Sequence, residues 1–172
     1  VILGQSGYNL SVASSSEVSM DLSGSFLMSK STLNTKTNAN GFSLYMGMQD
    51  STNSLYLNGD SSSTALPSVS NTYSYTSPGS ITNNTWGYAI PQSGNTNLAS
   101  GNGFNTGTYT DSSTSESDTK WASVPVKGSE QIIQNTNSAN DSTGVDLNVF
   151  YGVKANSSQA IGAYKGTIVY TA

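Results

Sequence analysis

The residue types that most often perform catalysis or bind zinc are missing from this chain. It contains no His, no Cys and no Arg among its 172 residues, and all six basic residues are Lys. Nucleophilic catalysis of the Ser-His-Asp or Cys-His kind is therefore excluded within the chain, and so are the commonest zinc ligands. Acid–base chemistry would depend on carboxylates, Lys or Tyr. The ten acidic residues are scattered, mostly over turn-like segments, so we predict a protein without enzymatic activity and without a cofactor.

Two local patterns could still carry chemistry. Ser117 stands three residues before Lys120, which is the S-x-x-K spacing of penicillin-binding enzymes. The pair lies in the Ser-rich stretch "DSSTSESDTK", where chance accounts for the spacing better. Calcium binds several loop oxygens, but neither acidic loop matches the EF-hand pattern, and we interpret both as solvated loops without a metal. These loops contain Asp111, Glu116 and Asp118, and Asp141 and Asp146.

Aromatic residues are the candidates for partner contact. Tyr73, Tyr75 and Tyr109 lie in loop-like segments, and we predict that they contact partners. Trp86 and Tyr88 alternate with smaller residues, as they would in a strand. Because a buried Trp is common in β-sandwiches, we expect these two side chains to lie in the core rather than form a sugar-binding platform.

Covalent modification is open at several positions. N-x-S/T sequons, which are acceptors for N-glycosylation, begin at Asn9, Asn83, Asn140 and Asn156. Some surface sandwiches that lack disulfides contain instead a cross-link between a buried Lys and an Asn beside a carboxylate. Lys154 and Lys165 lie in strand-like segments and are the candidates for such a link.

Composition limits the partners and the location. Ser, Thr and Asn make up about two-fifths of the chain, 9% of its residues are charged, and the formal net charge is −4. An acidic chain without Arg lacks the basic patch that neutralises phosphates, so we predict no nucleic-acid partner. No apolar run approaches the roughly 20 residues that span a bilayer, so we predict no membrane insertion. The polar, charge-poor composition favours an extracellular, cell-surface location.

Short runs with apolar residues at every second position predict half-buried antiparallel strands. No window shows helical periodicity, and Asn-Gly pairs beside the runs indicate hairpins or bulges. The segment 91–118 has few apolar residues and is predicted to form a long surface loop. We therefore predict an all-β single domain over residues 1–172. The runs are "YNLSV" (8–12), "EVSMDL" (17–22), "GFSLYMGM" (41–48), "SLYLN" (54–58), "TWGYAI" (85–90), "VDLNVFYGV" (145–153) and "YKGTIVYT" (164–171).

Several of these segments together resemble a known group of proteins. The text "NVFYGVKANSSQAIGAYKGTIVYTA", with "NNTWGYAI", "KWASVPVKGSEQII" and "NANGFSLYMGMQDSTNSLYLNG" before it, resembles immunoglobulin-like bacterial cell-surface and filament modules, among them WxL-type domains and fimbrial subunits. The likeness covers roughly residues 8–172. The chain departs from the common pattern at Ile161, where such modules usually carry Pro, and in its longer 91–118 loop. The resemblance implies an immunoglobulin-like antiparallel β-sandwich of about seven to nine strands with long polar loops, exported and without enzymatic activity.

These expectations give two functional hypotheses. The first is a structural subunit of an extracellular bacterial filament or surface assembly, which polymerises with itself by strand complementation between neighbours. The apolar residues Val1, Ile2 and Leu3, within a donor or linker segment 1–7, are the predicted assembly strand. The alternative is an adhesin module that binds a glycan or a host protein through the 91–118 loop. The last strand is apolar on both faces, so we expect it to be the second arm of a hairpin with 148–159, covered on both sides, and to end the domain.

Overall fold

A computed structural model describes residues 10–14, 25–104, 109–110, 115–139 and 143–172. Ten β-strands and no helix are found in these ranges, so the all-β prediction is confirmed there. No helix in them is long and apolar enough to cross a membrane. The strands are β1 (Leu10–Ser14), β2 (Phe26–Thr37), β3 (Phe42–Met48), β4 (Leu55–Leu57), β5 (Ala65–Leu66), β6 (Thr85–Ala89), β7 (Gln131–Thr136), β8 (Val145–Lys154), β9 (Tyr164–Lys165) and β10 (Ile168–Thr171).

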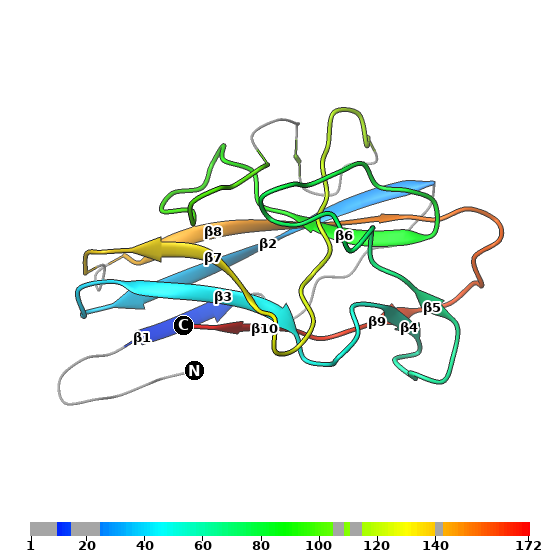
Figure 1. Ribbon diagram of the computed structural model, residues 1–172, viewed down its shortest axis with the longest axis horizontal. Coiled ribbons are helices and arrows are strands. Elements are labelled where there is room, and N and C mark those ends of the chain that lie inside the picture. The colour runs from blue at the N-terminus through cyan, green and yellow to red at the C-terminus, as the bar shows by residue number, and fades with distance from the viewer. Residues whose placement is uncertain (1–9, 15–24, 105–108, 111–114, 140–142) are drawn as a thin grey trace.

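The strands form three antiparallel sheets. A four-stranded sheet has the order β1-β2-β8-β6, a three-stranded sheet has the order β10-β3-β7, and a small third sheet has the order β5-β4-β9. The two larger sheets run along the long axis of the molecule, and the small sheet lies at one end (Figure 1). Buried residues from both larger sheets belong to one hydrophobic cluster. The two sheets therefore share a single core.

The β2–β8 ladder is the longest pairing in the molecule. It runs without a break from Phe26 opposite Lys154 to Thr35 opposite Val145. Burial along β2 nevertheless changes phase, because Phe26 and Met28 are buried at its start, whereas Leu33 and Thr35 are buried farther along. Since side chains alternate between the two faces of a strand, opposite faces of this sheet are covered at its two ends.

Aromatic rings cover one face at the Phe26 end. Trp121 contacts Phe26, with ring centroids 5.9 Å apart, and Tyr109, at 5.8 Å. Tyr109 in turn packs on Phe150 of β8 at 5.6 Å. We call Phe26, Tyr109, Trp121 and Phe150 the outer aromatic cluster. It forms a second apolar layer on the face that points away from the β10-β3-β7 sheet.

The opposite face of the four-stranded sheet packs on β3 and β10. Leu147, Val149 and Tyr151 of β8 are buried there, and the Tyr151 hydroxyl hydrogen-bonds the hydroxyl of Tyr170 in β10. In β3 the alternate residues Phe42, Leu44, Met46 and Met48 are all buried, although the pairing with β7 shifts register between Leu44 and Tyr45. This face contributes the larger part of the core.

Most predicted strands are confirmed, and three were not predicted. The runs 41–48, 54–58 and 85–90 contain β3, β4 and β6, the run 145–153 covers all of β8 but its last residue, and 8–12 overlaps β1. The run 17–22 lies outside the described residues. Strands β2, β5 and β7 were not among the predicted runs. The polar residues of β2 and β7 and the change of phase in β2 hide the period-two pattern, and β5 has only two residues.

The predicted closing hairpin is wrong. β8 and β10 belong to different sheets, and β10 pairs only with β3 among the described strands. The run 164–171 is split into β9 and β10. β10 is also an edge strand, because it lies at the end of the order β10-β3-β7, and its outer face is not covered, because Val169 is 41% exposed. The apolar residues on its two faces have different roles: Ile168 and Tyr170 pack against the core, and Val169 faces outward.

The 91–118 segment is anchored to the core rather than projecting freely. Within its described part, Phe104 is buried against Tyr75 and Tyr88. A backbone bridge joins Leu98 to Gln134 of β7, and the Tyr109 hydroxyl donates to the Lys120 carbonyl and accepts from the Lys120 amide. The described residues of this loop contain no strand, in agreement with an irregular segment.

Candidate functional site

A groove of about 630 Å³ is the best candidate for a binding site. Three distant segments line it: 51–56 before and within β4, 71–75, and 123–131 up to the start of β7. Tyr88 of β6 also lines it. None of the sixteen lining residues is charged, and most carry a hydroxyl or an amide group. The groove therefore presents neutral hydrogen-bonding groups beside tyrosine rings.

Side-chain hydrogen bonds hold the three segments together at the groove. The Asn53 amide nitrogen donates to the Asn71 Oδ1 at 2.9 Å and to the Ser123 Oγ at 2.7 Å. The buried indole of Trp86 donates from Nε1 to the Asn53 carbonyl at 2.9 Å, and the Ser123 amide donates to the Tyr73 carbonyl. We call Asn53, Asn71 and Ser123 the amide cluster. It fixes the position of the loops on a rigid, core-anchored frame.

Two polar atoms of the amide cluster have no hydrogen-bond partner among the described residues. Both N–H groups of the Asn53 amide are used within the cluster, whereas its Oδ1 accepts no hydrogen bond from the described residues. The Asn71 amide nitrogen likewise has no acceptor among the described residues, since only its Oδ1 is engaged. Asn71 is exposed. One acceptor and one donor therefore remain for a ligand.

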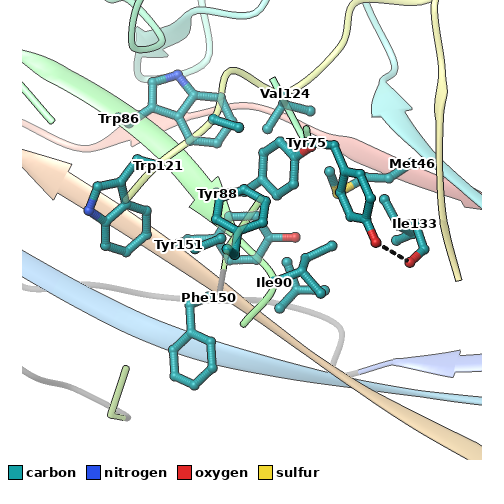
Figure 2. Packing of buried hydrophobic residues seen from close by; sticks show 14 of the residues in the cluster. Met46, Tyr75, Trp86, Tyr88, Ile90, Trp121, Val124, Ile133, Phe150 and Tyr151 are labelled. Carbon is teal, nitrogen blue, oxygen red and sulfur yellow. Dashed lines mark hydrogen bonds between the residues drawn. The ribbon is translucent and has the colours of Figure 1, made fainter. Parts of the chain in front are cut away.

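Tyr88, which also lines the groove, has a hydroxyl that is buried in the core. Its side chain is 0% exposed and its hydroxyl has no hydrogen-bond partner among the described residues. Figure 2 shows Tyr88 in the core with Tyr75 and Tyr151 around it. Burial raises the pKa of Tyr88 well above its ordinary value, and the neighbouring Tyr75 and Tyr151 hydroxyls raise it further. The hydroxyl is therefore protonated at any physiological pH.

The predicted partner-contact tyrosines do not share one site. Tyr73 and Tyr75 both line the groove, but Tyr109 belongs to the outer aromatic cluster on the other face of the four-stranded sheet. Tyr75 is 1% exposed and its hydroxyl donates to the Ala99 and Ile133 carbonyls, so the structure places it in the core beneath the surface. Tyr73 is half-buried and is the one of the three best placed to contact a ligand.

The two predicted core aromatics are confirmed, since Trp86 is 2% and Tyr88 0% exposed. Trp121 is buried as well. Of the predicted glycosylation sites, Asn83 and Asn156 are exposed. The Asn156 side-chain oxygen accepts hydrogen bonds from Asn84 and Ser158. Asn9 and Asn140, like the assembly residues Val1, Ile2 and Leu3, lie outside the described residues.

The remaining chemical candidates do not come together. Ser117 contacts the neighbouring Asp118, and the Lys120 amine donates to Ser80 rather than approaching Ser117.

Lys154 forms an ion pair of 2.7 Å with the exposed Glu116. Neither Lys154 nor the exposed Lys165 therefore has the buried surroundings that a cross-link needs. Among the described residues, no group of three acidic side chains could hold a metal ion; Asp111 and Asp141 lie outside them.

The free edge of β10 is the second feature of functional interest. The Gln49 amide donates to the Thr167 carbonyl at 2.9 Å, so Thr167 and Gln49 form a hydrogen-bonded pair. Such pairs alternate with non-bonded pairs in an antiparallel ladder. Ile168 and Tyr170, opposite Met48 and Met46, therefore point their backbone N–H and C=O groups away from β3. No described strand occupies that side.

Comparisons with protein-family models, with curated proteins and with solved structures gave no match. The function must therefore be inferred from the contacts of this chain alone. Sequence reasoning identified Tyr73 and Tyr75 but missed Asn53, Asn71 and Ser123. Nothing in the sequence distinguishes these three from the many other Asn and Ser residues in its loops, because the cluster forms only when segments 18 to 70 residues apart meet.

Proposed function

We propose that this protein is a structural subunit of an extracellular bacterial filament or surface assembly, which polymerises with itself by strand addition. The observation that carries this proposal is the free edge of β10. An edge strand presents unpaired N–H and C=O groups that another extended segment can pair with. Strand addition of this kind supplies affinity through main-chain hydrogen bonds and specificity through alternate side chains.

Exposed apolar side chains beside that edge support the same reading. Val169 is 41% and Tyr45 37% exposed. Val169 lies opposite Gly47, and Tyr45 lies opposite Thr171, two residues farther along. The two side chains are therefore diagonal neighbours on the outer face of the β10-β3-β7 sheet, within reach of one another. An added strand would cover Val169 while it pairs with the β10 backbone.

The donor in this proposal is the apolar segment Val1 to Leu3, within residues 1–7. Its apolar side chains suit an added strand, and the sequence resemblance to fimbrial-type modules points to the same role. The immunoglobulin-like character of the fold is part of the proposal. Two antiparallel sheets around one core, with irregular polar segments between strands, support it.

The adhesin alternative, with the 91–118 loop as the binding segment, has less support. The described part of that loop is anchored by Phe104 and Tyr109, and its exposed polar residues do not line the groove. A binding function gains more support from the groove, at residues outside this loop.

Electron microscopy and size-exclusion chromatography of the purified full chain test the proposal. We expect polymers from the full chain and monomers after deletion of residues 1–7, with unchanged far-ultraviolet circular dichroism in both. A full chain that stays monomeric at high concentration would overturn self-assembly. Polymers that persist after the deletion would overturn the donor role of Val1 to Leu3.

A further inference from the structure

We propose that the groove formed by the amide cluster and Tyr73 binds a neutral carbohydrate. This inference is independent of strand addition, since no groove-lining residue belongs to β10. It also differs from the adhesin alternative above, because all lining residues lie outside 91–118. The ligand class follows from the charge, the polar groups and the shape of the groove.

Charge excludes strongly ionic ligands. No Lys, Asp or Glu lines the groove, so a phosphate, a sulfate or a sialic acid carboxylate would lose its hydration without gaining an ion pair. Desolvating an unpaired charge is costly. The ligand must therefore be neutral.

Hydrogen-bonding groups favour a ligand with many hydroxyls. Among the described residues, Asn53 Oδ1 is an acceptor without a donor, and the Asn71 amide nitrogen is a donor without an acceptor. A hydroxyl both donates and accepts, so neighbouring sugar hydroxyls can satisfy both amides together.

Other contacts hold the polar groups of the groove in place, which supports a binding role for them. The Trp86 indole fixes the Asn53 backbone, and Ser123 links the 53 and 71 loops. The Tyr73 ring lies so close to Gly79 that a Cβ there would be 2.3 Å from the ring. Groups held in place before binding lose little conformational entropy on binding. A peptide is favoured less, because only Val124, Pro125 and Val126 give the lining aliphatic surface to anchor side chains.

Saturation-transfer NMR with maltotriose, cellotriose and N,N′,N″-triacetylchitotriose at millimolar concentration tests this inference, with sialyllactose as the charged comparison. We expect transfer to at least one neutral trisaccharide and none to sialyllactose. The variant that lacks residues 1–7 should bind equally well, which separates this result from assembly. Absence of transfer to all three neutral sugars, or transfer to sialyllactose alone, would overturn the proposal.

Titration of the bound trisaccharide against variants locates the site. Asn71→Ala should weaken affinity about tenfold, the effect of one lost hydrogen bond. Asn137→Ala removes an equally exposed Asn outside the groove and should leave affinity unchanged. Equal affinities for these two variants would place binding elsewhere and contradict the proposal. If Asn71→Ala folds poorly, Tyr73→Ala becomes the deciding variant. It should weaken affinity likewise, because Tyr73 lines the groove, is half-buried and makes no side-chain hydrogen bond to a described residue.

Discussion

At the scale of single residues, Gly152 controls the packing of the outer aromatic cluster. It lies opposite Gly87 in β6 and opposite Met28 in β2, and the two glycines leave room for the Trp121 side chain. A Cβ on Gly152 would lie 2.6 Å from the Trp121 ring, closer than real Cβ contacts. This position therefore needs glycine for space rather than for backbone freedom.

We expect Gly152→Ala to lower the free energy of unfolding by about 1–2 kcal/mol. Overpacking typically lowers the free energy of unfolding by about 1–3 kcal/mol. The smaller conformational entropy of the unfolded chain with Ala raises it by only about 0.4–1 kcal/mol. Urea denaturation measures the change. The loss should shrink when Trp121→Phe is present, because the smaller ring makes room. A stabilising Gly152→Ala, or an equal loss in both backgrounds, would contradict this packing.

Tyr88→Phe should raise the free energy of unfolding by about 1 kcal/mol. An unsatisfied buried hydroxyl costs about 1–3 kcal/mol, and the Tyr88 hydroxyl has no partner among the described residues. Tyr151→Phe is the matched control, since it removes a hydrogen bond to Tyr170 and should be destabilising. Chemical denaturation of both variants gives the comparison. Loss of stability in Tyr88→Phe would show that its hydroxyl is satisfied in solution.

At the scale of elements, β2 shows a limit of strand prediction from local sequence patterns. β3, β6 and β8 were predicted because each keeps one apolar face in phase along its length. β2 buries Phe26 and Met28 on one face and Leu33 on the other, so period-two alternation breaks in the middle. The break follows from the different layers that cover the sheet at its two ends. Those layers come from distant parts of the chain, which a local pattern does not contain.

Val169→Lys should prevent polymerisation without unfolding the domain. Lys on an edge strand is a common obstacle to edge-to-edge pairing, and Val169 is an exposed residue of β10. The control Ser61→Lys adds the same charge at an exposed turn away from this edge. Light scattering during assembly measures both. Normal polymers of Val169→Lys would show that β10 is not the acceptor, and equal inhibition by both variants would indicate a general charge effect.

At the scale of the whole molecule, buried tyrosines predict an alkaline limit to stability. Burial raises the pKa of Tyr109 and of Tyr151 to about 12, compared with about 10 in an unfolded chain. The unfolded state therefore releases these protons first, and the stability that they contribute is present below pH about 10. We expect thermal midpoints to fall as the pH rises from about 10 to about 12. The buried Tyr151 should lower the free energy of unfolding by about 1.4 kcal/mol per pH unit in this range. A constant midpoint across this range would show that both hydroxyls reach solvent.

The candidate site was less predictable than the fold. The all-β class follows from the local alternation of apolar and polar residues. The groove forms only where residues 53, 71 and 123 meet. Contacts between residues so far apart in the sequence depend on strand order. The three loop tyrosines were equivalent in the sequence. The structure separates them because Tyr75 is buried beside Phe104, Tyr109 lies against Trp121, and Tyr73 borders the groove.

Residue-resolved hydrogen–deuterium exchange, in monomers and in assembled material, tests strand addition at β10 most directly. The outward amides of Ile168 and Tyr170 should exchange fast in monomers of the chain without residues 1–7. In polymers of the full chain both should become strongly protected, since each would then pair with the added strand. The inward amides of Val169 and Thr171, already bonded to β3, should change much less. Polymers in which Ile168 and Tyr170 exchange as fast as in the monomer would contradict assembly through this edge.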